Sequence, residues 1–198
     1  PNPKPLSKAK AYLKHYESFD NNLLLLDSAK RFLNECSIEE SLPSLIKYYY
    51  LKKDYKKILK LNESYNLDDF HKTFTKSDLS LMYSRVADAY SYFQFYENSY
   101  LNYLNSLNFS PDNIDYMLKT AVIEIKLSKF EDARVRLYQI IEKNPYHEKS
   151  YYNLGLIYMN VDKNYSKAVT NFKIALSYNP DYELAKDKLL ILNDLIND

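Results

Sequence analysis

The chain has 198 residues, 27 of them Lys or Arg and 26 Asp or Glu, so its near-neutral charge provides no overall attraction to nucleic acid or acidic lipid. One cysteine, Cys36, excludes an internal disulfide and a cysteine-built zinc cage, and one glycine, Gly155, excludes the glycine-rich loops that cradle phosphates and dinucleotides. No run of about 18 apolar residues occurs, which predicts no membrane-spanning helix.

The opening residues, 1–5, are rich in proline and are predicted to form a linker. They include no initiating methionine, and we interpret the chain as a domain that follows an export signal or anchor in the cell envelope (periplasm) of a bacterium. A cytoplasmic location is the alternative. The chain is rich in Asn and Lys and contains 22 tyrosines, a composition that is typical of proteins encoded by AT-rich genomes. The tyrosines could also form an interaction surface.

Residues 6–79 are predicted to form divergent helical hairpins, because apolar residues recur there at helical spacing. The first hairpin, residues 6–36, carries this pattern at Ala9, Tyr12, Leu13, Tyr16, Leu23–Leu26, Ala29, Phe32 and Leu33. The second carries it on both sides of a turn at residues 52–54, at Leu42, Leu45, Ile46, Tyr49, Tyr55, Ile58 and Leu59. The connection 62–77 is expected to be an irregular insertion or an extended helix end.

From residue 80 onward prolines mark a repeat, since Pro111, Pro145 and Pro180 lie 34 and 35 residues apart. Each proline follows an amphipathic helix that it cannot continue. The spacing delimits three segments, residues 80–113, 114–147 and 148–182. The first two segments carry residues at positions equivalent to the signature of the third segment, which is given below. In the first segment they are Tyr83, Val86, Ala87, Tyr90, Tyr96, Ser99, Tyr103 and Ser106, and in the second they are Met117, Ala121, Phe130, Ala133, Leu137 and Ile140.

The clearest pattern lies in residues 148–182. Its signature positions are Tyr151, Leu154, Gly155, Tyr158, Ala168, Phe172, Ala175 and Pro180. In order and in nearly the same spacing, these residues resemble the tetratricopeptide repeat (TPR) family, with one extra residue in the turn 160–164. Gly155 and Ala168 are small enough for two helices to cross closely. Tyr151, Tyr158 and Phe172 are expected to fill the space between successive hairpins.

The resemblance implies an all-α, right-handed superhelix of stacked antiparallel helix hairpins, a TPR-like solenoid. Residues 80–182 would be three repeats, and residues 6–79 would be divergent ones. Residues 183–198 are predicted to form a capping helix, with one apolar stripe and charges on the other side. The stripe consists of Leu184, Leu189, Leu192 and Ile196.

The family resemblance implies a protein-interaction scaffold, adaptor or assembly factor that holds a partner protein or peptide in its concave groove. The first helix of each repeat lines that groove. The candidate positions are Arg85, Asp88, Tyr92, Lys119, Val122, Lys126, Tyr152, Asn153, Leu156 and Asn160. Their cations, amides and aromatic area suit a peptide of some acidic character.

One TPR subfamily grips the C-terminal carboxylate of heat-shock chaperones with lysines, asparagines and an arginine. In this chain the equivalent positions are Ser84, Asp88, Lys119, Lys149 and Asn153. Only Lys149 agrees with the subfamily pattern, so a clamp of that kind is not predicted.

A second hypothesis concerns a basic helix over residues 47–60, where lysines lie beside tyrosines. Such a face could bind RNA or anionic lipid. The lysines are Lys52, Lys53, Lys56, Lys57 and Lys60, and the tyrosines are Tyr48, Tyr49 and Tyr50. A solvated face with its tyrosines toward the core is the simpler interpretation, because the rest of the chain has no matching basic surface. Self-assembly through exposed tyrosines is a third hypothesis.

No catalytic residue, metal ligand, cofactor or small-molecule substrate is predicted. His15, His71 and His147 each lack a second ligand at the spacing of three or four residues that one helical face requires. Adjacent acidic pairs such as Glu39 with Glu40 point apart on a helix. Cys36 lies in an apolar helix pattern and is expected to be a small core residue rather than a nucleophile.

Overall fold

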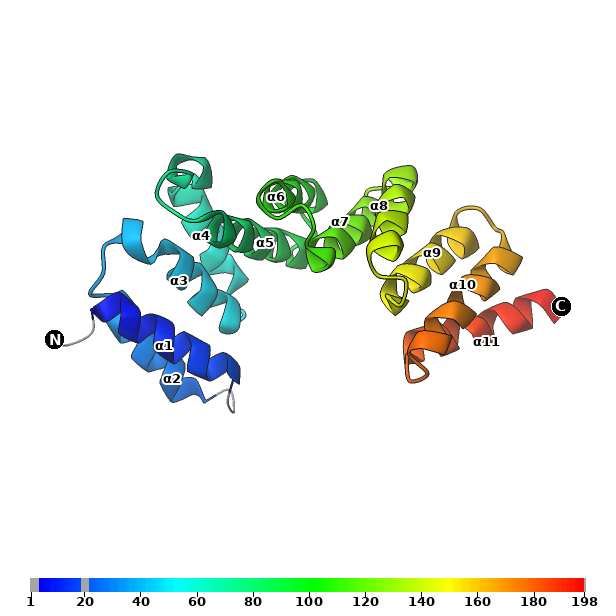
Figure 1. Ribbon diagram of the computed structural model, residues 1–198, viewed down its shortest axis with the longest axis horizontal. Helices are drawn as coiled ribbons and strands as arrows, with labels where there is room; N and C mark the ends of the chain where they lie inside the picture. The colour runs from blue at the N-terminus through cyan, green and yellow to red at the C-terminus, as the bar shows by residue number, and fades with distance from the viewer. Residues whose placement is uncertain (1–3, 19–21, 198) are drawn as a thin grey trace. The chain divides into compact units, whose positions relative to one another are not determined.

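The computed structural model describes residues 4–18 and 22–197, which form α-helices and one short 3-10 helix with no strand among them (Figure 1). The all-α class predicted from the sequence is therefore confirmed. The chain divides into two compact units, residues 1–111 (the N-terminal unit) and residues 112–198 (the C-terminal unit).

The N-terminal unit contains six α-helices and one 3-10 helix in its described residues. They are α1 (Pro5–Ser18), α2 (Leu23–Leu33), α3 (Ile38–Leu51), α4 (Tyr55–Ser64), η1 (Leu67–Phe70), α5 (Lys76–Tyr92) and α6 (Tyr96–Phe109). Helices that follow one another pack as pairs: α1 with α2, α3 with α4, and α5 with α6. Helix α3 also packs against α1 and α2, and α5 packs against α3 and α4.

Side-chain caps explain where several of these helices begin. Ser37 Oγ accepts a hydrogen bond from the Glu40 N–H at 3.3 Å, which satisfies a donor in the first turn of α3. Thr75 Oγ1 accepts from the Asp78 N–H at 3.1 Å in the same way. This cap starts α5 at Lys76, before the boundary at residue 80 that the proline spacing predicts. The irregular connection predicted at 62–77 contains η1.

In the described residues of the N-terminal unit, hydrophobic clusters hold α1 to α5 together. One joins α1, α2 and α3 through Ala9, Leu13, Tyr16, Leu26, Ala29, Leu33, Leu45 and Tyr48. Another joins α3, α4, η1 and α5 through Leu42, Ile46, Ile58, Leu67, Leu79, Met82, Tyr83, Val86 and Ala89. Both sets repeat at helical spacing, so burial of one face of each helix drives the pairing. Residues 1–3 of the predicted linker lie outside the described residues, and Pro5 already belongs to α1.

The C-terminal unit consists of α7 (Ile114–Lys126), α8 (Phe130–Lys143), α9 (Glu148–Asn160), α10 (Tyr165–Tyr178) and α11 (Glu183–Asn197). Helix α7 packs on α8 and α9, α9 packs on α8 and α10, and α10 packs on α11. Helices α7 and α9 begin at the residues that the repeat spacing predicts.

Helix α11 differs from the predicted cap. Among its described side chains α11 buries Ala185 and Leu192, and Leu192 packs with Ala168 and Phe172 of α10. Leu184 is 54% exposed, so its predicted place on the packed stripe is wrong. Outside the packed stripe α11 also exposes Leu190, Ile191 and Leu195, where charges were predicted. The side chain of Ile196 lies outside the described residues.

The turns within four helix pairs share one backbone feature, a non-glycine residue with positive φ. These residues are Lys53, Gln94, Ser128 and Lys163, with φ of 56°, 63°, 59° and 54°. The last three lie 34 and 35 residues apart, which is the spacing of the prolines. L-residues reach this region at a cost of roughly 1–2 kcal/mol. The chain contains only one glycine and uses other residues at all four turns.

Candidate functional site

In the N-terminal unit, two of the three predicted groove residues are engaged inside the protein. Arg85 is only 7% exposed, and its guanidinium lies 5.5 Å from the centre of the Tyr50 ring. The carboxylate of Asp88 accepts hydrogen bonds from the hydroxyls of Tyr50 and Tyr103. Burial, followed by the charge of Asp88, raises the pKa of the Tyr103 hydroxyl far above its ordinary range. Tyr92 is 66% exposed, so among these three it offers the most surface to a partner.

In the C-terminal unit, the predicted residues of α7 and α9 lie on two helices that pack against each other. Lys126 and Asn160 are exposed, and Lys119, Val122 and Asn153 are half-buried. Spacings of seven residues place Lys119 with Lys126, and Asn153 with Asn160, on the same side of their helices. This pair of helices therefore carries exposed or half-buried lysine and amide side chains together with one half-buried valine.

Two further predicted groove residues, Tyr152 and Leu156 of α9, are half-buried against the core that α10 and α11 complete. The Tyr152 ring centre lies 5.7 Å from that of Phe172 and 5.1 Å from that of Tyr182. Burial raises the pKa of Tyr182 to about 12. Part of each side chain therefore supports the fold, and only the remainder is available to a partner.

The signature residues occupy the contact between α9 and α10. Leu154, Gly155, Ala168, Phe172 and Ala175 are all buried. A Cβ at Gly155 would lie 2.5 Å from Phe172 Cε1, so the absence of a side chain lets the two helices approach. The close crossing predicted from the small residues is confirmed. Phe172 fills space within the pair, against Gly155, as well as toward α11.

The remaining signature residues lie at the ends of the same hairpin. Tyr151 donates a hydrogen bond to the carbonyl oxygen of Pro145 at 3.1 Å, and its ring lies 5.7 Å from that of Tyr178. Tyr158 contacts α8, as predicted for a residue between successive hairpins. Pro180 lies in the turn between α10 and α11, where it ends the incoming helix.

Comparisons of the sequence with known families identify no relative: no family model matches it, and none of the curated proteins is significantly similar. Solved structures do match. YrrB, described as a TPR protein with an unusual peptide-binding site, aligns with a TM-score of 0.67 at 14% identity, over 93% of this chain and 89% of its own. A mutant of MamA aligns with a TM-score of 0.62 at 18% identity, over 81% and 85%.

A third match is the first TPR of Spaghetti (RPAP3), determined with the HSP90 peptide SRMEEVD. It aligns with a TM-score of 0.56 at 17% identity, over 64% of this chain and 99% of its own. The chain has the TPR fold. At these identities the likeness concerns the arrangement of the helices and does not extend to the residues that bind a partner.

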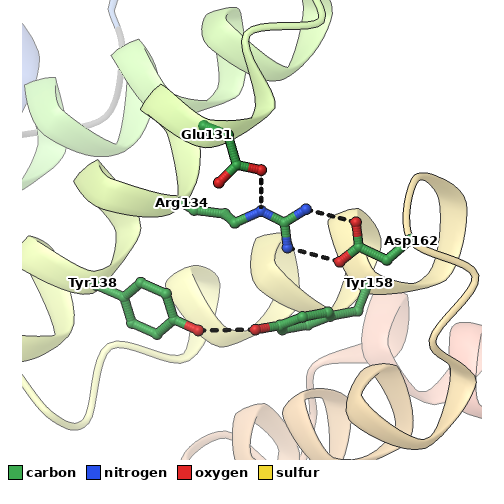
Figure 2. A network of polar contacts seen from close by, with 5 residues as sticks. All are labelled: Glu131, Arg134, Tyr138, Tyr158 and Asp162. Carbon is green, nitrogen blue, oxygen red and sulfur yellow. Dashed lines mark hydrogen bonds and ion pairs between the residues drawn. The ribbon is translucent and has the colours of Figure 1, made fainter.

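Within the TPR fold of the C-terminal unit, a polar network joins α8 to α9 and to the turn that follows it (Figure 2). Arg134 of α8 donates to both carboxylate oxygens of Asp162, at 2.6 and 2.8 Å, and to Glu131 at 3.1 Å. The Tyr138 and Tyr158 hydroxyls lie 3.0 Å apart, and this hydrogen bond, with burial second, raises the pKa of Tyr138 to about 12. Bidentate geometry of this kind fixes one helix pair against the next.

Replacing Asp162 by asparagine is expected to lower the free energy of unfolding by about 0.5–1 kcal/mol at pH 7, the range of a well-placed surface ion pair. The Arg134 guanidinium holds the pKa of the Asp162 carboxyl below its ordinary value of 3.8. The folded protein therefore binds this proton less readily than the unfolded chain, and the stabilisation is lost as the pH falls through the folded pKa. Urea unfolding of both proteins from pH 7 to pH 2.5 measures the difference. A difference that stayed constant down to pH 2.5 would contradict the expected result.

The lysine-rich stretch 47–60 is not one helix in the TPR fold, because α3 ends at Leu51 and α4 begins at Tyr55. The prediction of one basic helical face is wrong. Several of its lysines have acidic partners: Lys47 with Glu17 at 2.6 Å, Lys52 with Asp27 at 3.7 Å, and Lys57 with Asp54 at 3.1 Å. Tyr48 is buried, and its neighbours Tyr49 and Tyr50 pack against the core, as the simpler interpretation predicts.

Two histidines, the residue type that most often acts in catalysis or binds a metal, contribute to packing in this fold. His71 Nε2 lies 3.3 Å from the Tyr83 hydroxyl and 3.4 Å from Asp68, which joins η1 to α5. His147 Nδ1 lies 2.9 Å from Ser150 Oγ, and burial lowers the pKa of the imidazole. Among residues 4–18 and 22–197 no group of three or more His, Cys, Asp or Glu side chains could hold a metal ion. No helix in the same residues is long and apolar enough to cross a membrane.

Cys36 lies beyond the end of α2, so its predicted place within a helix is wrong. Its thiol donates a hydrogen bond to the Phe32 carbonyl oxygen at 3.3 Å. Burial, aided by Glu40 and Glu35, raises the pKa of the thiol. A raised pKa reduces the reactive thiolate, which agrees with a structural role.

Proposed function

We propose that this protein is a protein-interaction scaffold that holds an extended segment of a partner along α7 and α9 of its C-terminal unit. Support comes from the composition of this helix pair, which carries the exposed Lys126 and Asn160 together with the half-buried Lys119, Val122 and Asn153 on two helices that pack against each other. Amide side chains can bond to the main chain of an extended peptide, and lysines can pair with its acidic residues. The occupant is therefore a partner segment with acidic and aliphatic side chains.

Structural neighbours support the same class of function. One carries a peptide-binding site by its description, and another was determined with an HSP90 peptide bound. The chaperone clamp remains outside the proposal, because Ser84 is buried and Asp88 is bonded to tyrosines in this chain. The partner is consequently expected to lie against the lysine and amide side chains rather than to insert a C-terminal carboxylate into a clamp.

Site-specific crosslinking tests the location of the partner. A photoreactive phenylalanine analogue placed at Val122 or Asn160 is expected to form a covalent adduct with the same protein in native lysate. The analogue at Lys173, an exposed position on α10, is the control and is expected to form none. Equal adducts at all three positions, or none at Val122 and Asn160, would argue against the α7–α9 surface.

A charge reversal at Lys126 then measures the electrostatic part of binding. We expect Lys126→Glu to weaken binding of the crosslinked partner segment about tenfold, the effect of roughly 1.4 kcal/mol. The matched reversal Lys173→Glu is expected to leave it unchanged, since Lys173 lies on another helix. Fluorescence anisotropy with the synthetic segment gives both dissociation constants, and identical values for the two variants would contradict the proposal.

A further inference from the structure

The turn between α5 and α6 presents two large apolar side chains to water. Phe93 is 40% exposed and Phe95 is 55% exposed. Gln94 between them has a φ of 63°, and hydrogen bonds from its N–H to Ser91 O and from the Phe95 N–H to Tyr90 O, each 2.9 Å long, fix the turn. The backbone of the turn is therefore fixed, and each ring packs edge-on against a tyrosine of α5, Phe93 at 5.1 Å from Tyr92 and Phe95 at 6.5 Å from Tyr90 between ring centres.

Phe95 also occupies a position where a polar residue would stabilise the helix better. It is the N-cap of α6 and makes no side-chain capping bond. In two equivalent turns the N-cap is Asp54 or Asn164, and each accepts a backbone hydrogen bond from the helix that it starts. Asp and Asn are preferred at this position, whereas large apolar residues are not. In the third equivalent turn the N-cap, Lys129, also makes no side-chain capping bond, so capping of α6 does not account for a phenylalanine here.

A groove of about 690 Å³ lies between this turn and α4. This volume falls within the range of roughly 300–1,000 Å³ that is typical of ligand pockets. Leu59 of α4 and the two phenylalanines form its apolar part, and Lys56, Lys57 and Lys60 line its α4 side. All of these residues belong to the N-terminal unit.

The lysines of the groove differ in their partners. Lys57 is paired with Asp54 at 3.1 Å and lies 5.2 Å from the Tyr49 ring centre. Lys56 and Lys60 are exposed and, four residues apart, lie on one side of α4. With Lys57 neutralised by Asp54, the remaining charges that line the groove are two lysines and Glu63, so the excess is positive.

We propose that this groove is a second docking surface, which binds an acidic peptide segment carrying an aromatic or aliphatic residue. The apolar residue would pack against Phe93, Phe95 and Leu59, and the acidic residues would pair with Lys56 and Lys60. Nucleic acid fits less well, because it brings one phosphate per nucleotide to a groove that also contains Asp54 and Glu63. The surface is separate from α7 and α9, and its occupancy does not depend on the function proposed for them.

Selection from a phage library of random 12-residue peptides, with the full chain immobilised, provides the probe. We expect enriched peptides that combine Asp or Glu with Phe, Leu or Ile. Binding of an enriched synthetic peptide, measured by fluorescence anisotropy, is expected to weaken at least about tenfold in Lys56→Glu/Lys60→Glu, the scale of a lost close charge pair. The matched control Lys72→Glu/Lys76→Glu, which reverses two exposed lysines outside the groove, is expected to bind within about twofold of the wild type, since distant surface charges are largely screened.

Phe95→Asn separates binding from folding. The side chain of the new asparagine can accept a hydrogen bond from the Asn98 N–H, as the Asp54 carboxylate accepts one from the Lys57 N–H. The Tm of the variant is therefore expected to be unchanged or higher. Peptide affinity is nevertheless expected to fall at least about tenfold, because one apolar wall of the groove is lost. Lys126→Glu is expected to leave this peptide's affinity unchanged, which distinguishes the groove from the α7–α9 surface.

Three outcomes would overturn the proposal. The first is a library selection that enriches no acidic peptide. The second is a peptide that binds Lys56→Glu/Lys60→Glu and Phe95→Asn as tightly as the wild type. The third is a 12-nucleotide oligouridylate that binds the groove and is released by the lysine reversals while no peptide is retained, which would identify RNA as the occupant.

Discussion

Replacement of Arg136 by methionine is expected to lower the free energy of unfolding by about 3–5 kcal/mol, the cost of removing one partner from a buried ion pair. Glu124 of α7 is completely buried, and Arg136 of α8 donates three hydrogen bonds to its carboxylate at 2.7, 3.0 and 3.2 Å. Methionine fills much of the same volume but leaves this carboxylate without its guanidinium. Urea unfolding followed by circular dichroism at 222 nm measures the loss.

The double variant Glu124→Leu/Arg136→Met is the control for this prediction. Replacing both members of a buried pair by apolar residues of similar size is often neutral or stabilising. We therefore expect the double variant to be more stable than Arg136→Met alone. An Arg136→Met protein as stable as the wild type would show that the ion pair does not hold α7 and α8 together.

Gly155→Val is expected to lower the free energy of unfolding by about 3 kcal/mol, the upper part of the range for overpacked cores. A Cβ at this position would lie within 2.9 Å of three atoms of the Phe172 ring. The ring is fully buried and cannot move aside freely. Valine has a better helix propensity than glycine, but this offsets only about 0.5 kcal/mol of the expected loss of stability.

A smaller residue at position 172 should relieve part of this strain. In Gly155→Val/Phe172→Leu we expect the combined loss of stability to be smaller than the sum of the two single losses, since the residues are in contact. Asn160→Val, an exposed change on the same helix, is expected to alter stability by less than about 0.5 kcal/mol. Additive losses in the double variant would mean that the two side chains do not share one space.

Several features of the fold were predictable because they depend on local sequence. Pro111, Pro145 and Pro180 each follow the end of a helix, and small residues at 155 and 168 permit a close crossing. The predicted starts of α7 and α9 are confirmed for this reason. Helix α5 starts earlier than predicted, since the capping bond of Thr75 decides its first residue.

The candidate site was less predictable, because burial depends on residues far apart in the chain. Asp88 lies on the expected helix, yet Tyr50 and Tyr103 approach its carboxylate from two other helices. The sequence indicated one part of the groove at α4, because it showed basic residues beside aromatic ones in the stretch 47–60. Its aromatic wall, however, comes from Phe93 and Phe95, more than thirty residues later.

The sequence by itself determined the all-α class, the spacing of the helix pairs and the residues of their closest crossing, because each follows from periodicity and side-chain size along one stretch of chain. Only the tertiary structure decided which charged side chains are paired within the protein and which are exposed to a binding partner. Glu124 is buried with Arg136, Lys57 is paired with Asp54, and Lys56 and Lys60 line a groove. Charge partners are brought together by helix packing, so their identity depends on distances in space that no local pattern records.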